Sequence, residues 1–246
     1  MNTNLVIYPY KMTSESARDL AKRVKAKRVW PDRAYQPKAN DLIINWGNSN
    51  MPNWGKGVRM INNPHQVAKA INKLITFVIL ESCGVSVPRF TTSRLEAKTK
   101  FNKIVIRHLL NSREGRGVEI LNSNQVIPKA PLYVEFIKGK EYRVHVFDGK
   151  VIDYAKKIGT KEISVLSHRQ GTKFIRRDLE RITGVEKTAL KAIKALGLDF
   201  GAIDIIRADE GGVFILEVNT APGLSETGLK LYTEAIKLKK TTPINK

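Results

Sequence analysis

The sequence lacks several features that would place it in a particular class of protein. It has a single cysteine, Cys83, so no internal disulfide can form, and the apolar stretch around this residue predicts a buried structural thiol. No apolar run approaches the roughly 18–20 residues that a membrane-spanning helix needs. The first residues also lack the basic lead and long apolar core of a signal peptide. We therefore expect a cytoplasmic protein with no membrane partner.

Two common nucleotide-binding signatures are also missing. No G-x-x-x-x-G-K-[S/T] segment occurs, and no G-x-G-x-x-G opens a predicted helix after a strand. Aromatic residues make up only 7% of the chain, and zinc-finger spacing, a basic zipper and an aromatic RNA-binding signature are all absent. These absences exclude P-loop and Rossmann proteins and argue against the common nucleic-acid-binding modules.

Acidic residues are few compared with basic ones. The chain has 43 Lys and Arg against 23 Asp and Glu, a formal net charge of +20 and a pI near 10.0. Such an excess attracts polyanions, which include nucleotides, nucleic acids and acidic proteins, but it carries no information about the fold. A solubility role and attraction of small phosphorylated ligands are the alternatives that the charge leaves open.

The chain is long enough for two to three small domains, with 246 residues of which 42% are hydrophobic. We divide it into residues 1–63, 64–131 and 132–246. In the first part, strands are predicted at residues 5–8 and 42–45, on either side of a basic helix at residues 14–27 whose N-cap is Ser14. Strand, helix and strand in this order predict a small α/β domain.

The other two parts also mix helices and strands. Residues 64–131 are predicted to begin with one helix from Pro64 to about Cys83, which Gly84 ends, and to continue with strands at residues 103–107 and 118–121. In the third part the patterns predict, in order, three strands, a helix, two strands and a helix: 132–137, 141–147, 151–158, 184–196, 201–207, 213–218 and 228–238. The fold class is therefore α/β in the broad, α+β sense.

Three polar residues stand out in the last two predicted strands. Asp204 lies within an apolar segment, and Glu217 and Asn219 lie two residues apart at the end of the next strand, so these two share a face. If the strands pair antiparallel, Asp204 reaches the same place. Buried carboxylates need charge compensation, and an oxygen set from Asp, Glu and Asn suits Mg²⁺. The alternative is a half-exposed hairpin whose carboxylates face solvent.

This ending closely resembles the terminal motif of the ATP-grasp superfamily. Residues 202–206, AIDII, and residues 214–223, FILEVNTAPG, match the motif in order and spacing. The resemblance implies that Asp204, Glu217 and Asn219 hold one or two Mg²⁺ ions, with Mn²⁺ as an alternative, that bridge the phosphates of ATP. It also implies an ATP-grasp fold, in which two α+β lobes, here residues 64–131 and 132–246, sandwich the nucleotide behind a small α/β domain.

The resemblance extends upstream to residues of the adenine site. In the family the backbone of a hinge reads the adenine edge, which corresponds here to Glu135, Phe136 and Ile137. An acidic residue a few positions further on binds the ribose, which corresponds to Glu141. Arg143 corresponds to a family arginine near the phosphates or the acceptor. A cross-strand ion pair on a hairpin is the alternative explanation for Glu141 and Arg143.

Basic residues and glycines supply the candidate phosphate contacts. Arg107 stands where the family usually has a lysine, just before a loop in which Gly115 and Gly117 permit positive φ and close approach to phosphates. A surface turn is the usual explanation for such a lone Gly-x-Gly. Lys73 resembles a second phosphate lysine, with an exposed helical lysine as the alternative. Lys156 and Lys157 stand where many relatives carry an arginine, and we assign Lys156, with Arg143, as a candidate catalytic residue.

The resemblance covers residues 64–238 and is nearest to the ribosomal-protein glutamate ligases. It implies a carboxylate–amine ligase, in which a substrate carboxylate attacks the γ-phosphate of ATP and an amine then displaces phosphate from the acyl phosphate. The substrates would be a carboxylate and an amine on a small molecule, peptide or protein tail, and homo-oligomers are common in the family. The alternative is a basic protein that binds nucleic acid or an acidic protein, and that either modifies this polyanion or carries a vestigial ATP site.

Overall fold

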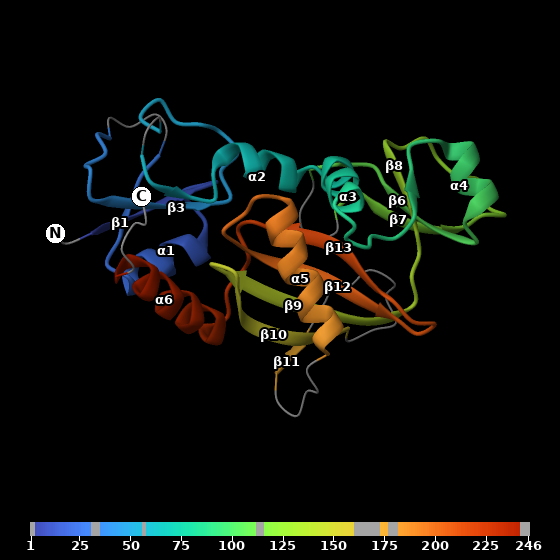
Figure 1. Cartoon of the computed structure of the whole chain (residues 1–246). Coiled ribbons are helices and arrows are strands. Elements are labelled where there is room, and N and C mark those ends of the chain that lie inside the picture. The colour runs from blue at the N-terminus through green and yellow to red at the C-terminus, as the bar shows by residue number, and fades with distance from the viewer. Residues whose placement is uncertain are drawn as a thin grey trace.

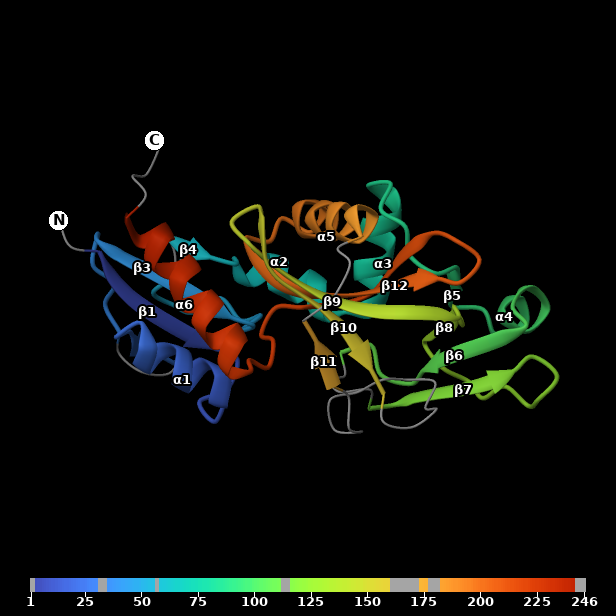
Figure 2. The same ribbon diagram turned by 90° about the horizontal axis from the view of Figure 1, so that it is seen from below.

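Three β-sheets lie one after another along the molecule (Figure 1). The computed structural model describes residues 3–30, 35–55, 58–111, 116–159, 173–176 and 182–241. The chain forms the first sheet, passes to a small sheet at the far end, and returns through a five-stranded middle sheet (Figures 1 and 2). Within the described residues, no helix has the length and apolar character needed to cross a membrane.

The first sheet confirms the predicted strand–helix–strand pattern. Its four strands are parallel and lie in the order β2–β1–β3–β4: β1 (Asn4–Pro9), β2 (Lys27–Arg28), β3 (Asp41–Trp46) and β4 (Met60–Ile61). Helix α1 (Glu15–Arg23) begins at the predicted cap, where the Ser14 hydroxyl accepts a hydrogen bond from the Ala17 N–H at 3.4 Å. It ends earlier than predicted because Lys25 adopts a left-handed φ of 54°.

The last helix of the chain also belongs to this first sheet. Helix α6 (Glu226–Thr241) lies beside α1 (Figure 2). Its buried side chains pack in the same hydrophobic core as those of α1, β1 and β3. The five-stranded sheet contributes Phe200, which stacks on Trp46 with 5.2 Å between ring centroids. The core of the first domain therefore uses both ends of the sequence, which differs from a division at residue 63.

Two helices replace the single helix expected after Asn63. Helix α2 (Pro64–Ile71) and helix α3 (Lys73–Ser82) are separated at Asn72, which leaves the helical region with φ −90° and ψ 111°. The Asn72 side chain accepts a hydrogen bond from the Ile75 N–H at 3.1 Å and so caps the second helix. This break makes Lys73 the first residue of α3.

The predicted burial of Cys83 is wrong. This residue is the C-cap of α3 and is exposed, because the helix has already ended and its buried apolar residues, Phe77 and Leu80, lie earlier. Gly84 follows with a φ of 67°, and it ends the helix as predicted.

The small sheet at the far end of the molecule is antiparallel in the order β5–β8–β6–β7. Its strands are β5 (Phe90–Thr91), β6 (Lys103–Arg107), β7 (Val118–Asn122) and β8 (Leu132–Glu135). Helix α4 (Arg94–Lys100) packs on it around a small separate core. Strand β8 pairs with both β5 and β6, so the expected boundary after residue 131 falls before the strand that completes this sheet.

The middle sheet is antiparallel in the order β11–β10–β9–β12–β13. Its strands are β9 (Gly139–Phe147), β10 (Lys150–Ile158), β11 (Lys173–Ile175), β12 (Phe200–Ala208) and β13 (Val213–Asn219). The predicted hairpin turn forms at Asp148 and Gly149, whose φ values of 49° and 71° suit a type I′ turn. Helix α5 (Thr183–Ala195), with α2 and α3, covers one apolar face. The opposite face carries charged side chains.

Candidate active site

A cavity of about 660 Å³ lies between the middle sheet, the small sheet and the first domain. The middle sheet supplies a charged floor, and the small sheet together with α3 supplies one wall. A second wall comes from the first domain, in the stretch between Tyr10 and Asp19, next to residues 221–224. Sequence reasoning missed this second wall, because the only signal in that stretch was the helix cap at Ser14.

The predicted acidic hairpin forms part of the floor. Strands β12 and β13 pair antiparallel, with Asp204 directly opposite Glu217 and Ala202 opposite Asn219. Asp204, Glu217 and Asn219 all line the cavity, so the expected convergence of these three side chains is confirmed as geometry. Within the described residues, no group of three or more His, Cys, Asp or Glu could hold a metal ion. A metal ion at this hairpin would therefore need further oxygen ligands besides the two carboxylates. The amide oxygen of Asn219 and oxygens of a molecule bound in the cavity could supply them.

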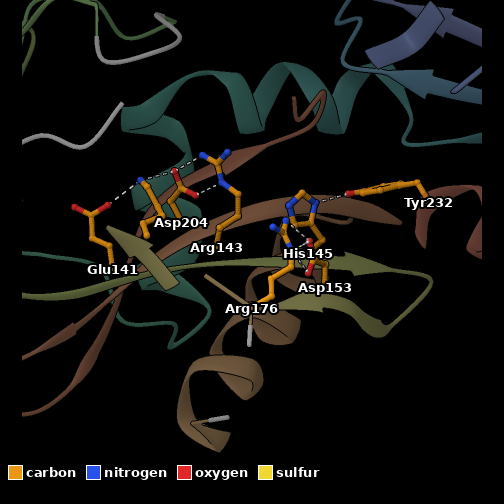
Figure 3. Close-up of polar contacts among 8 residues, drawn as sticks. Glu141, Arg143, His145, Asp153, Arg176, Asp204 and Tyr232 are labelled. Atoms are coloured by element: carbon orange, nitrogen blue, oxygen red, sulfur yellow. Dashed lines mark hydrogen bonds and ion pairs between the residues drawn. The ribbon is translucent and has the colours of Figure 1, made fainter. Parts of the chain in front are cut away.

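Asp204 is held by cationic side chains from two neighbouring strands (Figure 3). Arg143 on β9 donates from Nε to Asp204 Oδ1 at 2.6 Å and from its terminal nitrogen to Oδ2 at 2.7 Å. The Lys157 ammonium on β10 donates to Oδ2 at 3.3 Å. Burial alone would raise the pKa of Asp204, but Arg143 and Lys157 outweigh it and hold that pKa well below its usual value.

Lys157 links this pair to a second carboxylate. Its ammonium lies 2.8 Å from Glu141 Oε2, so it bridges Glu141 and Asp204. Burial lowers the pKa of Lys157, but the two carboxylates outweigh burial and raise it. The structure brings Lys157 and not Lys156 to the cavity, because adjacent residues of a strand point to opposite faces. Glu141 and Arg143 each form a cross-strand ion pair, with Lys157 on β10 and Asp204 on β12, as the alternative explanation predicted, and both also line the cavity.

Lys73 enters the cavity from the start of α3. Its side chain is only 7% exposed, and its ammonium lies 3.4 Å from Glu217 Oε1. The alternative of an exposed helical lysine is therefore wrong. The break at Asn72 explains the difference, because it turns the first residue of α3 toward the five-stranded sheet instead of continuing the surface of α2.

Arg107 approaches the same floor from the end of β6. It lines the cavity, and its buried Nε has no hydrogen-bond partner among the described residues. Burial lowers the pKa of the guanidinium, with Glu217 opposing this effect. A buried cationic nitrogen without a partner is costly unless a ligand compensates it, and a phosphate would supply both the charge and the acceptor. The residues present therefore fit a nucleotide phosphate.

The hinge runs from Glu135, the last residue of β8, through Phe136 and Ile137 toward β9, and all three residues line the cavity. The Glu135 side chain forms a two-point ion pair with Arg89 at 2.6 and 2.8 Å, so a contact of this hinge with an adenine edge would come from its backbone. The Phe136 ring carries the Lys103 ammonium at 4.4 Å from its centroid. These contacts of Glu135 and Phe136 hold the hinge against the small sheet.

The structure does not place the two glycines of the predicted phosphate loop in the cavity lining. Gly115 lies outside the described residues. Gly117 begins the turn into β7 with a φ of 68°, and its carbonyl accepts a hydrogen bond from the His108 N–H at 2.8 Å. It does not line the cavity, whereas its neighbour Val118 does. A phosphate contact for either glycine stays a prediction.

Comparisons with known proteins agree with this arrangement. Residues 91–239 match the family model described as the D-ala D-ala ligase C-terminus. A probable alpha-L-glutamate ligase of Parasynechococcus marenigrum is 30% identical over 191 residues, which cover 68% of this chain and 40% of that protein. A D-alanine–D-alanine ligase of Methylacidiphilum infernorum is 30% identical over 181 residues, which cover 65% of this chain and 59% of that protein. The chain thus spans 40% to 59% of the length of these two relatives.

Solved structures match nearly the whole chain. D-alanyl-alanine synthetase A from Vibrio cholerae superposes with a TM-score of 0.71 at 13% identity, covering 98% of both chains. The ATP-grasp ligase PsnB, complexed with a precursor variant, Mg and ADP, gives a TM-score of 0.70 at 14% identity, covering 98% of this chain and 100% of PsnB. The fold is therefore the ATP-grasp fold, and the match over residues 91–239 shows that the chain belongs to the family of the D-Ala–D-Ala ligase C-terminus.

Proposed function

We propose that the chain is an ATP- and Mg²⁺-dependent carboxylate–amine ligase that forms an amide bond through an acyl phosphate and releases ADP and phosphate. One observation carries this proposal. The acidic hairpin of Asp204 and Glu217 faces a single cavity together with Arg107, whose buried Nε has no partner among the described residues. A polyphosphate with a divalent cation would satisfy both sets of charges at once.

The nucleotide would lie between the small sheet and the middle sheet. The hinge at Glu135, Phe136 and Ile137 would hold the adenine, and Glu141 would face the ribose. Asp204, Glu217 and Asn219 would hold Mg²⁺, or Mn²⁺ in its place, and the ion would offset the negative charge of the phosphates. We propose the same three units that the sequence suggested, a domain at residues 1–63 and nucleotide lobes at 64–131 and 132–246, except that α6 belongs to the first domain and β8 to the lobe of the small sheet.

The chain itself would contribute electrostatics and alignment rather than a covalent intermediate. Lys73, Arg107, Arg143 and Lys157 surround the proposed phosphate region with positive charge, which stabilises charge that spreads over phosphoryl oxygens. No cysteine or histidine is among the described residues that line the cavity, so no thiolate or imidazole nucleophile is at hand. We assign the catalytic role that the sequence suggested for Lys156 to Lys157, because Lys157 is the one that lines the cavity.

The acid and the amine would enter at the wall formed by the first domain. That wall offers Lys11 to a carboxylate and Glu15 and Asp19 to an ammonium group. The acceptor could be a small molecule, a peptide or a protein tail. If the acceptor is a polyanion that uses the net charge of +20, its binding will fall steeply with salt while ATP binding changes little.

The test is ATP binding by calorimetry, with and without Mg²⁺, on the wild type and on Glu217→Ala. We expect Mg²⁺-dependent binding in the wild type and at least about a tenfold loss in the variant, because one oxygen ligand is gone. Glu210→Ala is the matched control, since Glu210 is an exposed glutamate in the turn of the same hairpin. Wild-type protein that binds no ATP, or a Glu217→Ala variant as tight as Glu210→Ala, would refute the site.

A further inference from the structure

The polar face of the middle sheet continues beyond Arg143 toward the first domain (Figure 3). His145 follows two residues after Arg143 on β9, and its cross-strand neighbours are Ala202 on β12 and Asp153 on β10. His145 is 3% exposed and Asp153 is 7% exposed. Asp153 is held in a two-point ion pair by Arg176, with distances of 2.8 to 3.1 Å. His145, Asp153 and Arg176 have no role in the proposed chemistry.

His145 meets a residue from the far end of the sequence. Its Nδ1 lies 3.2 Å from the Tyr232 hydroxyl of α6, and both side chains are buried. The Tyr232 ring packs edge-on against Trp46, Phe147 and Phe200, with centroid distances of 5.3, 6.1 and 5.9 Å. A phenylalanine could make the same ring contacts. The hydroxyl therefore adds little buried apolar area. Its hydrogen bond instead restricts the orientation of Tyr232 relative to His145, because a hydrogen bond tolerates only a narrow range of distance and angle.

Helix α6 is connected to the wall at which the substrates would enter. It begins at Glu226, two residues after Leu224, which with Pro222 and Gly223 lines the cavity. The Leu224 N–H donates to the Ser16 hydroxyl of α1 at 3.0 Å, and Arg23 of α1 pairs with Glu226. Helix α6 and the 222–224 segment before it are therefore in contact with both ends of α1.

We propose that the hydrogen bond between Tyr232 and His145 is a positioning device for the substrate end of the cavity. This hydrogen bond fixes the position of α6 relative to β9, the strand that carries Arg143. Through α6 it also fixes the position of the first-domain wall. Tyr232 and His145 are positioning residues and touch no substrate. The inference builds on the proposed ligase function, but the contact itself makes a prediction that does not depend on activity.

The test is Tyr232→Phe, with Tyr154→Phe as the matched control. The Tyr154 hydroxyl accepts a hydrogen bond from the Ile182 N–H at 3.4 Å on the opposite, α5-covered face of the same sheet, so the control removes a comparable bond. Hydrogen exchange on the ligand-free proteins should be faster in Tyr232→Phe at residues 10–24 and 221–230, by about fivefold, which corresponds to one hydrogen bond of about 1 kcal/mol. It should be unchanged at the hinge, residues 134–138, and Tyr154→Phe should leave all of these segments unchanged.

Kinetics give the second readout, with ADP release measured on ATP and L-glutamate. Tyr232→Phe should raise the KM for L-glutamate about fivefold and leave the KM for ATP within about twofold, whereas Tyr154→Phe should alter neither. Unchanged exchange at residues 10–24 and 221–230 would overturn the inference. Faster exchange in a protein that releases no ADP would uphold the contact and count only against L-glutamate as a substrate, whereas the absence of ATP binding would refute the proposed function. Equal rises of both KM values would reduce Tyr232 to a general stabiliser.

Discussion

Arg143 on β9 and Asp204 on β12 stand opposite each other in the strand register and form a two-point ion pair at 2.6 and 2.7 Å. Lys157 reaches the same carboxylate from β10 at 3.3 Å. Both oxygens of Asp204 are thus in contact with cations before any metal is considered. The carboxylate that is the proposed metal ligand also holds three strands of the floor together.

Replacing Asp204 should therefore affect stability as well as ligand binding. In Asp204→Asn, Arg143 and Lys157 are left buried without their shared partner, and we expect the free energy of unfolding to fall by about 3–5 kcal/mol. Asp209→Asn is the control, because Asp209 is 50% exposed and lies 4.0 Å from an exposed lysine, so the loss should stay below about 1 kcal/mol. Urea denaturation measures both, and equal losses would show that the ion pair contributes little.

Binding of the metal should depend on the nucleotide. Mg²⁺ alone must compete with Arg143 and Lys157 for the Asp204 oxygens, whereas phosphates offer these cations another partner. We expect the Kd for Mg²⁺ to fall by about tenfold or more when ADP is present, measured by calorimetry. In Arg143→Met the affinity for Mg²⁺ alone should rise. A Kd that is the same with and without ADP would contradict this competition.

The adjacent lysines of β10 provide a test of which side chain faces the site. Lys157→Met removes the charge that bridges Glu141 and Asp204, and we expect kcat/KM to fall by about 100-fold or more. Lys156→Met changes the same residue type on the opposite face, and its effect should stay within about threefold. The reverse order in an ADP-release assay would restore Lys156 as the catalytic lysine.

Stability should fall as the pH is lowered from neutrality, in a window that His145 sets. Burial, assisted by the charge of Arg143, lowers the pKa of His145 from 6.5 to about 4. The unfolded chain therefore binds the proton more readily between these values, and the free energy of unfolding falls as pH drops from 6.5 to 4, by on the order of 3 kcal/mol. Urea denaturation at several pH values measures the slope. The slope should be smaller in His145→Gln, and an unchanged slope would mean that other groups produce it.

The acidic hairpin could be predicted from sequence because its information is local. The period of two along a strand puts Glu217 and Asn219 on one face, and the short turn at residues 209–212 forces the antiparallel pairing that brings Asp204 alongside. The hinge and Glu141 were assigned through the resemblance in motif and order; the structure places them in the lining of the cavity, and their contacts with a nucleotide stay a prediction. These are the parts in which neighbours in sequence are also neighbours in space.

The choice between Lys156 and Lys157 could not be made in this way. The register of β10 against β9 shifts at a bulge between Val151 and Asp153, and a shift of one residue reverses which side chains face the cavity. The wall from the first domain and the contact between His145 and Tyr232 depend on the docking of α6, which joins residues 87 positions apart. No pattern of spacing within one element contains that information.

The return of α6 to the first sheet also bears on how the chain folds during synthesis. Strands β1 and β3 and helix α1 leave the ribosome early, but the apolar face that α6 covers stays open until residues 226–241 emerge. At translation rates of about 5–20 residues per second this delay is on the order of 10–40 s. The first domain thus begins to emerge long before α6 can complete it, so nascent chains that stop short of α6 should be the ones that bind chaperones.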